Sequence, residues 1–467
     1  MLTLASDSAH GVPPGVTALF GGILAATILA LAFEEKLHAK KSLIVGLFAA
    51  VSLLLAEAFG LMHRDPVEFL GHTVDLPVYI PGIDWGVIAI MLGSGLFVDV
   101  TSKSGLFSWI AIRLTKISRG EPMRLLWYYG VMTVVFSAVL NNVTAMIIVG
   151  SLSGVSLRKL GRENLLLGFL LVEGLLTNIG GLLTLISSVP NIIVGTTADI
   201  SFVTFFLKSS PYVVVATIAT IVLGAKIFAI PKLRTPEERA EADELVAGFD
   251  ERDGIESPGF FWFGVVMLVL FIITIATTSV LPYISDLGMG FVALSFAAIM
   301  LVRYKSEVDT YYRAIDWDLL GFFAALFALI NVMEHAQVLA VIGGWIQHLI
   351  GLGPTLGSGS MLLSAAVASS VTDNIPLAAM LAKILGGIPG ISDDPTSTYW
   401  WAVIFGANLG GNLTPIGSAS TLVAVTLIHK YGISFSFADF VKRAFPFAMV
   451  HIGIALVYVV VVLRLFS

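Results

Sequence analysis

The chain has 467 residues, of which 57% are hydrophobic and only 12% are charged. Soluble domains carry about 25% charged residues, so these charges are too few to cover a soluble enzyme or a nucleic-acid-binding protein. The mean hydropathy is +0.93. Cysteine is absent, which excludes disulfides and thiolate metal sites. The composition predicts an all-α polytopic membrane protein, because strands of a membrane barrel would alternate polar and apolar residues.

Apolar runs long enough to cross a bilayer, about 20 residues each, follow one another along the chain. We expect ten crossings, near residues 15–33, 42–61, 84–101, 163–199, 203–230, 258–281, 288–303, 316–334, 398–428 and 440–465. The segments 104–118 and 338–350 are amphipathic, which favours arm helices lying in the membrane interface.

Four of the apolar runs carry polar residues at their centres. The runs 123–157 and 358–388 are each long enough for two helices, and we interpret them as re-entrant hairpins. The crossings 163–199 and 398–428 have middles rich in Gly and Thr, which predicts broken helices.

Basic residues cluster in a few short stretches between the crossings. The stretches 34–41, 102–124, 156–163, 225–257, 303–315 and 429–443 contain 22 of the 26 Lys and Arg residues. By the positive-inside rule these stretches are cytoplasmic. This predicts both termini outside the cell, the hairpin 123–157 entering from the cytoplasm and the hairpin 358–388 entering from outside.

The two halves of the chain share short motifs in the same order and at a nearly constant offset. Ile83-Asp84-Trp85 recurs as Ile315-Asp316-Trp317, and Asn142 matches Asn374 at the same offset. The motif that begins at Asn178 recurs at Asn408. Since each half has an odd number of crossings plus one hairpin, we expect inverted repeats, 15–230 and 258–467, joined by a cytoplasmic linker, 231–257.

Each predicted hairpin has a polar tip at which a new helix begins. The tips read Leu140-Asn141-Asn142-Val143-Thr144 and Thr372-Asp373-Asn374-Ile375-Pro376. The positive N-terminal end of a helix can face a ligand, and amide and carboxylate oxygens can hold a cation. The same residue types are ordinary N-caps, so each tip alone fits capping as well as binding.

The broken crossings supply a second layer of polar residues. Their candidate binding residues are Asn178, Gly180, Thr184 and Ser187 in the first half, and Asn408, Gly410, Thr414 and Ser418 in the second. Glycines permit unwinding, although close helix packing explains the glycines equally well. The tips contribute Asn141, Asn142, Thr144, Asp373 and Asn374 to the same predicted site for a substrate or ion.

Two carboxylates lie within the apolar runs, Asp373 at the second tip and Glu173 in the crossing 163–199. A charge inside a membrane is costly, so such acids are candidates for proton coupling. Glu173 also fits a buried acid bonded to a neighbouring helix.

No motif for an enzyme or a metal site is visible. The eight His residues show no ligand spacing, and a P-loop and a G-x-S-x-G motif are both absent. We therefore predict a transporter that uses no cofactor and no metal, with no nucleic-acid partner.

The motifs together resemble the ion transporter superfamily, in the group containing arsenite permeases, NhaD-type Na⁺/H⁺ antiporters and the melanosomal P protein. The resemblance rests on residues 106–126, SAVLNNVTAM (137–146), residues 177–195, VTDNIPLAAM (371–380) and NLGGNLTPIGSAS (408–420). It implies an elevator-type secondary transporter of the cell inner (plasma) membrane, usually a homodimer. It also places Asn141, Asn142, Thr184, Asp373, Asn374 and Thr414 at the binding site.

The sequence departs from many of these relatives after the first Gly-Gly motif. Patterns such as IGDPPN carry an acid there, whereas this chain has Ile186-Ser187-Ser188-Val189-Pro190-Asn191. Hydroxyls and amides suit a neutral solute such as arsenous acid, so we expect proton-coupled export of arsenite or antimonite. A Na⁺/H⁺ antiporter and a Na⁺-coupled carboxylate transporter are the alternatives.

Overall fold

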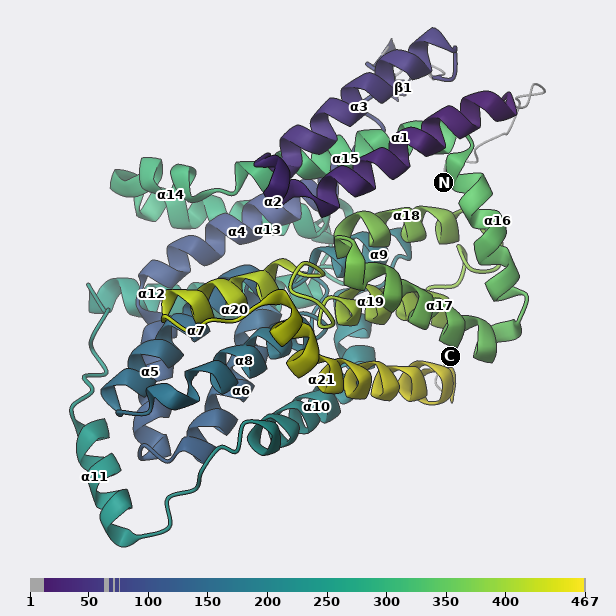
Figure 1. Cartoon of the computed structure of the whole chain (residues 1–467). Coiled ribbons are helices and arrows are strands. Elements are labelled where there is room, and N and C mark those ends of the chain that lie inside the picture. The colour runs from purple at the N-terminus through teal and green to yellow at the C-terminus, as the bar shows by residue number, and fades with distance from the viewer. Residues whose placement is uncertain (1–11, 63–66, 70–71, 75, 466–467) are drawn as a thin grey trace. The chain divides into compact units, whose positions relative to one another are not determined.

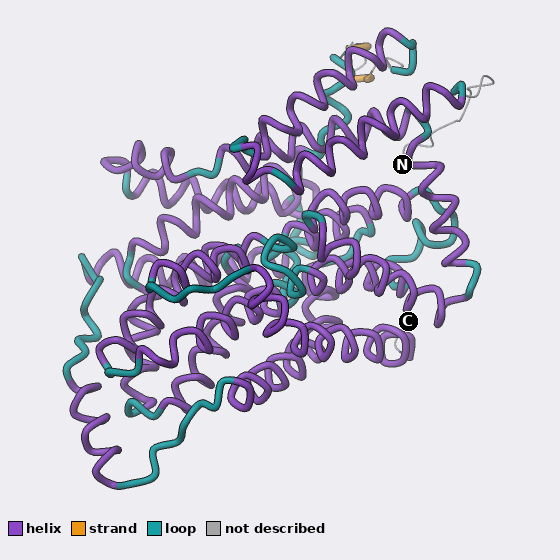
Figure 2. Tube along the Cα trace, in the orientation of Figure 1, coloured by secondary structure: helices purple, strands orange, loops and turns teal. Residues whose placement is uncertain are grey.

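The computed structural model describes residues 12–62, 67–69, 72–74 and 76–465. Within these residues almost all regular structure is helical, as the composition predicts (Figures 1 and 2). The two strands, β1 (Val67–Phe69) and β2 (His72–Val74), pair antiparallel. The chain ends, predicted to lie outside the cell, fall outside the described residues.

The helices of the first part of the chain are α1 (Pro14–Ala32), α2 (Glu34–Leu37), α3 (Lys41–Ala58), α4 (Trp85–Lys103), α5 (Leu106–Ser118), α6 (Pro122–Val139), α7 (Asn142–Lys159), α8 (Leu166–Gly180), α9 (Val189–Thr197), α10 (Phe202–Ile227) and α11 (Pro236–Ala247). The later helices are α12 (Pro258–Thr277), α13 (Ile284–Arg303), α14 (Val308–Ala314), α15 (Trp317–His335), α16 (Val338–Ile350), α17 (Gly353–Val371), α18 (Asn374–Gly386), α19 (Thr398–Gly410), α20 (Ala419–Lys430) and α21 (Phe437–Val457).

Nine helices among the described residues are long and apolar enough to cross a membrane. They coincide with nine of the ten predicted crossings, so the chain is a multi-span membrane protein. The tenth predicted crossing, 398–428, is divided between α19 and α20, and neither piece has the length of a span. Both segments predicted to be arm helices are helical, as α5 and α16, and their place in the membrane interface stays a prediction.

Both predicted hairpins are pairs of helices separated by a short polar tip. The first consists of α6 and α7, and the second of α17 and α18. Each second helix begins with a side-chain cap. The Asn141 side chain accepts a hydrogen bond from the Thr144 amide, and the Asp373 side chain accepts one from the Ile375 amide.

Both predicted breaks are present as well. Helix α8 ends at Gly180 and helix α9 starts at Val189, while α19 ends at Gly410 and α20 starts at Ala419. Every residue of α19 is buried, and so is every residue of α8 except Leu167. A helix buried on all sides lies in the interior of its bundle.

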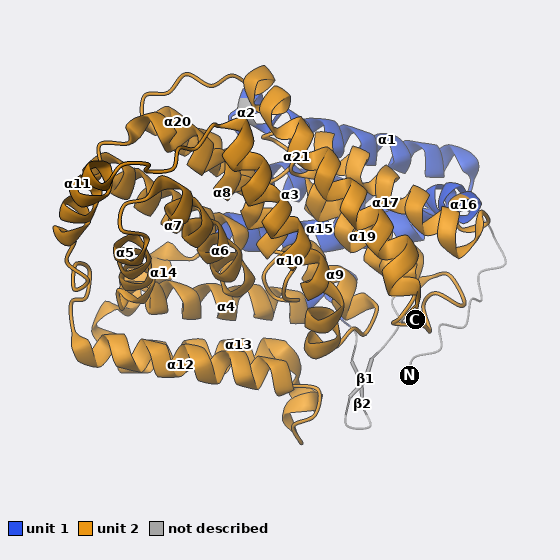
Figure 3. Cartoon of the chain, turned by 90° about the horizontal axis from the view of Figure 1, so that it is seen from below, with its two compact units in different colours: residues 1–85, 316–348 blue, residues 86–315, 349–467 orange. Residues whose placement is uncertain are grey.

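The described chain separates into two compact units (Figure 3). Unit 1 comprises residues 1–85 and 316–348, in which α3 packs on α1 and α15. Its apolar side chains Leu43, Leu47 and Leu54 are exposed, as expected of a helix that faces lipid. Unit 2 comprises residues 86–315 and 349–467 and contains both hairpins and both broken helices. Each unit draws residues from both predicted halves, and the division into two repeats remains a prediction.

The predicted linker 231–257 carries a helix of its own. The Thr235 hydroxyl and the Glu238 carboxylate form a capping box at the start of α11. Glu251, just after this helix, pairs with Arg113 (2.9 Å) and Lys116 (3.4 Å) of α5. The two cations lower the pKa of Glu251 below its ordinary value. These ion pairs hold the linker against an arm helix of the same unit.

Candidate functional site: two hairpin tips and two broken helices

The predicted site residues all belong to unit 2, in four segments: the two hairpin tips and the two loops that break α8–α9 and α19–α20. Figure 2 shows these loops in teal within the helical body of the unit. Hydrogen bonds join the first break to α19 and the second break to α8, as set out below. Segments from opposite halves of the sequence therefore lie side by side.

The first tip is tied to its surroundings by side-chain amides. Asn141 is exposed and caps α7 through the Thr144 amide (2.8 Å). The Ser137 hydroxyl shares its one hydrogen between Oδ1 of Asn142 (2.9 Å) and the carbonyl of Thr177 (2.6 Å), and Nδ2 of Asn142 donates to Oδ1 of Asn178 (3.3 Å). Asn142 is thus fixed in orientation although it is partly exposed.

The second tip is built from the same residue types but is held differently. Asp373 caps α18 by accepting a bond from the Ile375 amide (3.0 Å). Asn374 is 9% exposed, and its side chain makes no hydrogen bond within the part of the chain that the structure describes. The amide of Asn374, unlike that of Asn142, is available to a ligand without breaking an internal bond.

Each broken loop is tethered to the hairpin of its own half by a threonine. The Thr184 hydroxyl donates to the carbonyl of Ala138 (2.5 Å), and the Thr414 hydroxyl donates to the carbonyl of Ser370 (2.6 Å). The two threonines occupy matching positions of the repeated motifs, and so do the two carbonyls, so one contact occurs twice. These bonds satisfy carbonyls at the ends of α6 and α17.

Glycines let the broken helices approach the hairpins closely. A Cβ atom on Gly180 would lie 2.6 Å from the Val134 carbonyl oxygen, and one on Gly410 would overlap the Ala366 carbonyl oxygen. Both glycines therefore serve close packing of helix on helix. Their predicted part in binding a substrate or ion stays a prediction.

The two breaks exchange hydrogen bonds with the opposite half. From the first break, the Ser188 hydroxyl donates to Oδ1 of Asn408 (2.7 Å). From the second, the hydroxyls of Ser418 and Ser420 each donate to Oδ1 of Asn178 (2.9 Å). Asn178 and Asn408 are fully or almost fully buried. The predicted ligands Asn178, Asn408 and Ser418 thus hold the two breaks together.

Ser187, also predicted as a ligand, donates to the carbonyls of Gly181 (2.7 Å) and Thr184 (2.8 Å) within its own loop. The structure therefore divides the predicted site residues into two groups. Those of the broken helices are engaged in internal bonds and shape the loops. Those of the tips, Asn141, Asn142, Thr144, Asp373 and Asn374, are exposed or half-buried except for Asn374, and their contact with a solute stays a prediction.

Glu173, the second candidate for proton coupling, lies in α8 and is fully buried. One carboxylate oxygen accepts a short hydrogen bond from the Ser153 hydroxyl of α7. The other has no hydrogen-bond partner among the described residues. A buried charge with only one bonded oxygen is costly, so Glu173 stays a candidate for proton coupling although it also bonds α8 to α7.

The four polar segments contain no positive side chain. Residues 137–146, 177–191, 369–376 and 408–421 include no Lys and no Arg. No cluster of three or more His, Asp or Glu side chains that could hold a metal is present in the described parts of the chain. Positive potential at the tips comes instead from the N-terminal ends of α7 and α18.

Several residues of the network are absent from the sequence prediction. Ser137 and Ser369, at matching positions of the two hairpins, donate to the carbonyls of Thr177 (2.6 Å) and Ala407 (2.5 Å). The repeat could have revealed this pair, because both serines lie in the motifs that define it. The repeat does not point to Asn412 and His451, because the matching positions of the first half hold the apolar residues Leu182 and Ala216.

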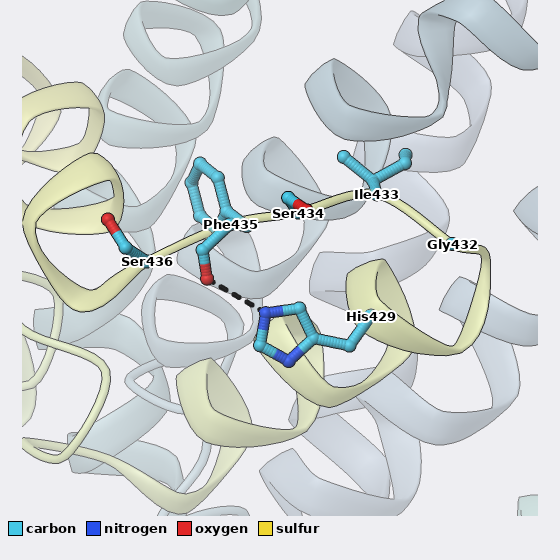
Figure 4. A pocket seen from close by; sticks show the side chains of 6 residues that line it. All are labelled: His429, Gly432, Ile433, Ser434, Phe435 and Ser436. Atoms are coloured by element: carbon cyan, nitrogen blue, oxygen red, sulfur yellow. Dashed lines mark hydrogen bonds between the residues drawn. The ribbon is translucent and has the colours of Figure 1, made fainter.

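A surface pocket of about 490 Å³ lies at the end of α20 (Figure 4). It is lined by His429 and residues 432–436, and His429 Nε2 lies 2.8 Å from the carbonyl oxygen of Phe435. None of the predicted site residues lines it.

The sequence model of the citrate transporter family, CitMHS, matches residues 12–406. The chain belongs to this family.

The 46 kDa membrane protein of Mycobacterium leprae is 29% identical over 81% of this chain and 86% of its own. An uncharacterized transporter of Mycobacterium tuberculosis is 31% identical over the same shares. The mouse P protein is 24% identical over 94% of this chain and 62% of its own. The resemblance to the superfamily that contains the P protein is confirmed.

Solved structures show the same fold. The YdaH transporter of Alcanivorax borkumensis superposes with a TM-score of 0.58 over 92% of this chain and 98% of its own, at 14% identity. MtrF of Neisseria gonorrhoeae, described as one of a class of antimetabolite efflux pumps, superposes with a TM-score of 0.55 over 91% and 95%, at 15% identity. The chain is therefore a membrane transporter, not an enzyme.

Proposed function

We propose that this transporter is a secondary active transporter that exports a small inorganic solute in exchange for protons, with arsenite or antimonite as the favoured substrate. The carrying observation is the composition of the site. The four segments that meet in unit 2 offer amides, hydroxyls and one carboxylate at a tip, and no Lys or Arg. Such a lining hydrogen-bonds a neutral polyhydroxyl solute without a fixed countercharge.

The matched contacts support the two inverted repeats. The tethers of Thr184 and Thr414, and the bonds of Ser137 and Ser369, join equivalent positions of the two halves. In transporters of this architecture the binding site lies between the repeats, near the membrane midplane. We propose that both hairpins and both broken helices move together as the transport domain of an elevator, with the protein as a homodimer in the plasma membrane and both termini outside.

Coupling to protons is assigned to the two acids. Asp373 lies at a tip, next to Asn374, where a bound solute and a proton can influence each other directly. Glu173 is two helical turns before the break of α8 and contacts Ser153. We assign the exchanging proton to Asp373, with Glu173 as the alternative carrier.

A carboxylate is the second candidate substrate, favoured by the description of the family model as a citrate transporter. The N-terminal ends of α7 and α18 attract a carboxylate, but the Thr144 and Ile375 amides already bond the capping side chains and Pro376 has no N–H. Such a substrate would need Na⁺ as its countercharge, because the segments hold no Lys or Arg. Exchange of Na⁺ for protons at the same oxygens is the third candidate.

The test is flux through the purified protein in proteoliposomes that contain a pH-sensitive dye, with arsenite, Na⁺, Li⁺ and citrate offered separately. Proton movement driven by arsenite, saturable and lost when the proton gradient is collapsed, supports the proposal. Proton movement driven by Na⁺ or Li⁺ but not by arsenite overturns it in favour of an antiporter. Citrate uptake that requires Na⁺ overturns it in favour of a carboxylate importer.

A further inference from the structure

His451 of α21 is fully buried, and both of its ring nitrogens have polar neighbours. Nε2 lies 2.7 Å from the Thr220 hydroxyl of α10, and Nδ1 lies 3.3 Å from Nδ2 of Asn412 in the second break. A histidine in the apolar interior that connects a helix to a broken loop is not explained by packing alone.

The neighbours of the ring determine which nitrogen carries the proton. Nδ2 of Asn412 also faces the carbonyl oxygen of Leu175 (3.3 Å), and a carbonyl can only accept, so the group there is the NH₂. The same NH₂ faces Nδ1 of His451, which must therefore be the unprotonated acceptor. Thr220 gives its own hydrogen to the carbonyl of Ala216 (2.6 Å) and so accepts from Nε2–H. The ring is neutral, with its hydrogen on Nε2.

This assignment extends to the first hairpin tip. With its NH₂ directed at Leu175 and His451, Asn412 presents Oδ1 to Nδ2 of Asn178 (2.8 Å). Asn178 then presents Oδ1 to Ser418, Ser420 and Nδ2 of Asn142. The hydrogen bonds from Asn142 through Asn178 and Asn412 to His451, here called the amide chain, all run in one direction.

We propose that His451 is a positioning residue for the substrate site: as the neutral Nε2–H tautomer it fixes the direction of the amide chain and thereby the orientation of Asn142 at the tip. Reversal of any one amide would set two NH₂ groups or two oxygens against each other along the chain, so the ring and the tip are linked although they do not touch. The consequence for transport rests on the proposed function, whereas the tautomer and the linkage do not.

Histidine-selective ¹⁵N NMR of the protein in bilayers tests the tautomer directly. The signal of His451 is assigned by its disappearance in His451→Asn. The expected spectrum shows a proton on Nε2 and none on Nδ1. A proton on Nδ1, or on both nitrogens, overturns the proposal whether or not the protein transports any solute tested.

The linkage is tested by thermal unfolding of His451→Leu, Asn142→Ala and the double variant. If the chain acts as a unit, the double variant loses clearly less melting temperature than the sum of the two single losses. Additive losses overturn the linkage. This measurement also requires no transport activity.

The effect on the site is tested by the KM for arsenite in proteoliposomes. His451→Leu is expected to raise the KM about tenfold, the equivalent of one well-placed hydrogen bond. His451→Asn places an amide oxygen where Nδ1 was, and is expected to restore the KM to within about threefold. Tyr212→Phe is the matched control, since it removes a bond to the His451 carbonyl (3.1 Å) and leaves the ring contacts.

The outcomes separate the two proposals. An unchanged KM in His451→Leu, or a Tyr212→Phe effect as large as that of His451→Leu, overturns the positioning role. Absence of arsenite flux in the unaltered protein overturns the proposed substrate, and the NMR and unfolding measurements then decide the role of His451 alone.

Discussion

The two hairpin tips have nearly the same sequence and opposite degrees of constraint. In the first, Asn142 is bonded on both sides of its amide and is the end of the amide chain that starts at His451. In the second, the equivalent Asn374 has no hydrogen bond from its side chain among the described residues, and an acid stands where the first tip has Asn141. Asn142 is held in place and can bind a ligand without the entropic cost of ordering its side chain. Asn374 has no internal side-chain bond in the described part of the chain, so its orientation can change when the neighbouring acid gains or loses a proton. If both tips belong to one site, as proposed, the same duplicated motif would supply a fixed amide from one tip and a titrating acid from the other.

The strongest test of this difference is the loss of each asparagine. Asn374→Ala and Asn142→Ala are both expected to abolish transport, because each removes an amide from the proposed binding site. Only Asn142→Ala should also destabilise the fold, by about 1–2 kcal/mol, because it breaks internal bonds. Proteoliposome flux and thermal unfolding of the two variants measure the two effects.

Retained flux in both variants would mean that these residues only begin helices. Equal losses of melting temperature would remove the contrast between a bonded and an unbonded tip. Thr426→Val serves as the control, since its exposed hydroxyl bonds only within α20.

The next largest effect is expected from exchanging the capping residues. Asp373→Asn gives the second tip the Asn-Asn sequence of the first, and a carboxamide cannot take up a proton. Solute movement should therefore lose its dependence on the proton gradient, while stability stays within about 0.5 kcal/mol because Asn and Asp cap helices equally well. An unaltered pH dependence would assign the proton to Glu173. Asn141→Asp, which adds an acid to the first tip, is the matched exchange.

A smaller and unequal effect is expected from adding a methyl group to the second glycine of each break. A Cβ atom on Gly181 would lie 2.5 Å from Oδ1 of Asn142, a side chain that can shift, whereas one on Gly411 would meet the Gly417 carbonyl oxygen (2.9 Å). Gly181→Ala should mainly raise the KM, and Gly411→Ala should mainly lower stability, by about 1–3 kcal/mol. The KM and the free energy of unfolding are measured for both variants. A larger loss of stability in Gly181→Ala, or a larger rise of the KM in Gly411→Ala, would contradict the prediction.

The smallest effects are expected from the threonine tethers. Thr184→Val removes one buried hydrogen bond and should cost about 1 kcal/mol. Thr414→Val removes the matching, partly buried bond and also the bond that this hydroxyl accepts from the Gly417 amide (3.2 Å), so its loss should be larger by about 0.5–1 kcal/mol. Unfolding in denaturing detergent measures both losses, and a larger loss for Thr184→Val would contradict this order.

Features that recur in the two halves could be predicted from the sequence. Both hairpins, both breaks and the caps at Asn141 and Asp373 coincide with motifs that repeat at a nearly constant offset along the chain. Regular apolar runs likewise indicated the spans, since length and hydropathy alone define them.

Features that break the repeat could not be predicted. The partners of His451 are 39 residues away at Asn412 and 231 residues away at Thr220, and no pattern in one sequence joins them. The internal bonds of Thr184, Ser187 and Asn178 could not be predicted either. A sequence does not tell whether a hydroxyl or amide binds a ligand or bonds another group of the protein. The breaks were predicted to bind a solute; the structure shows their side chains in internal bonds, and solute binding there stays a prediction.

The crossed bonds between the breaks also bear on how the protein is made. Ser188 finds its acceptor on Asn408, 220 residues further along the chain, and Asn178 finds its donors on Ser418 and Ser420. During synthesis the Ser188 hydroxyl and the Asn178 amide oxygen therefore lack these partners until α19 and α20 have been inserted. A chain stopped before residue 398 thus leaves Ser188 and Asn178 without these partners, and the crossed bonds form only when translation is almost complete.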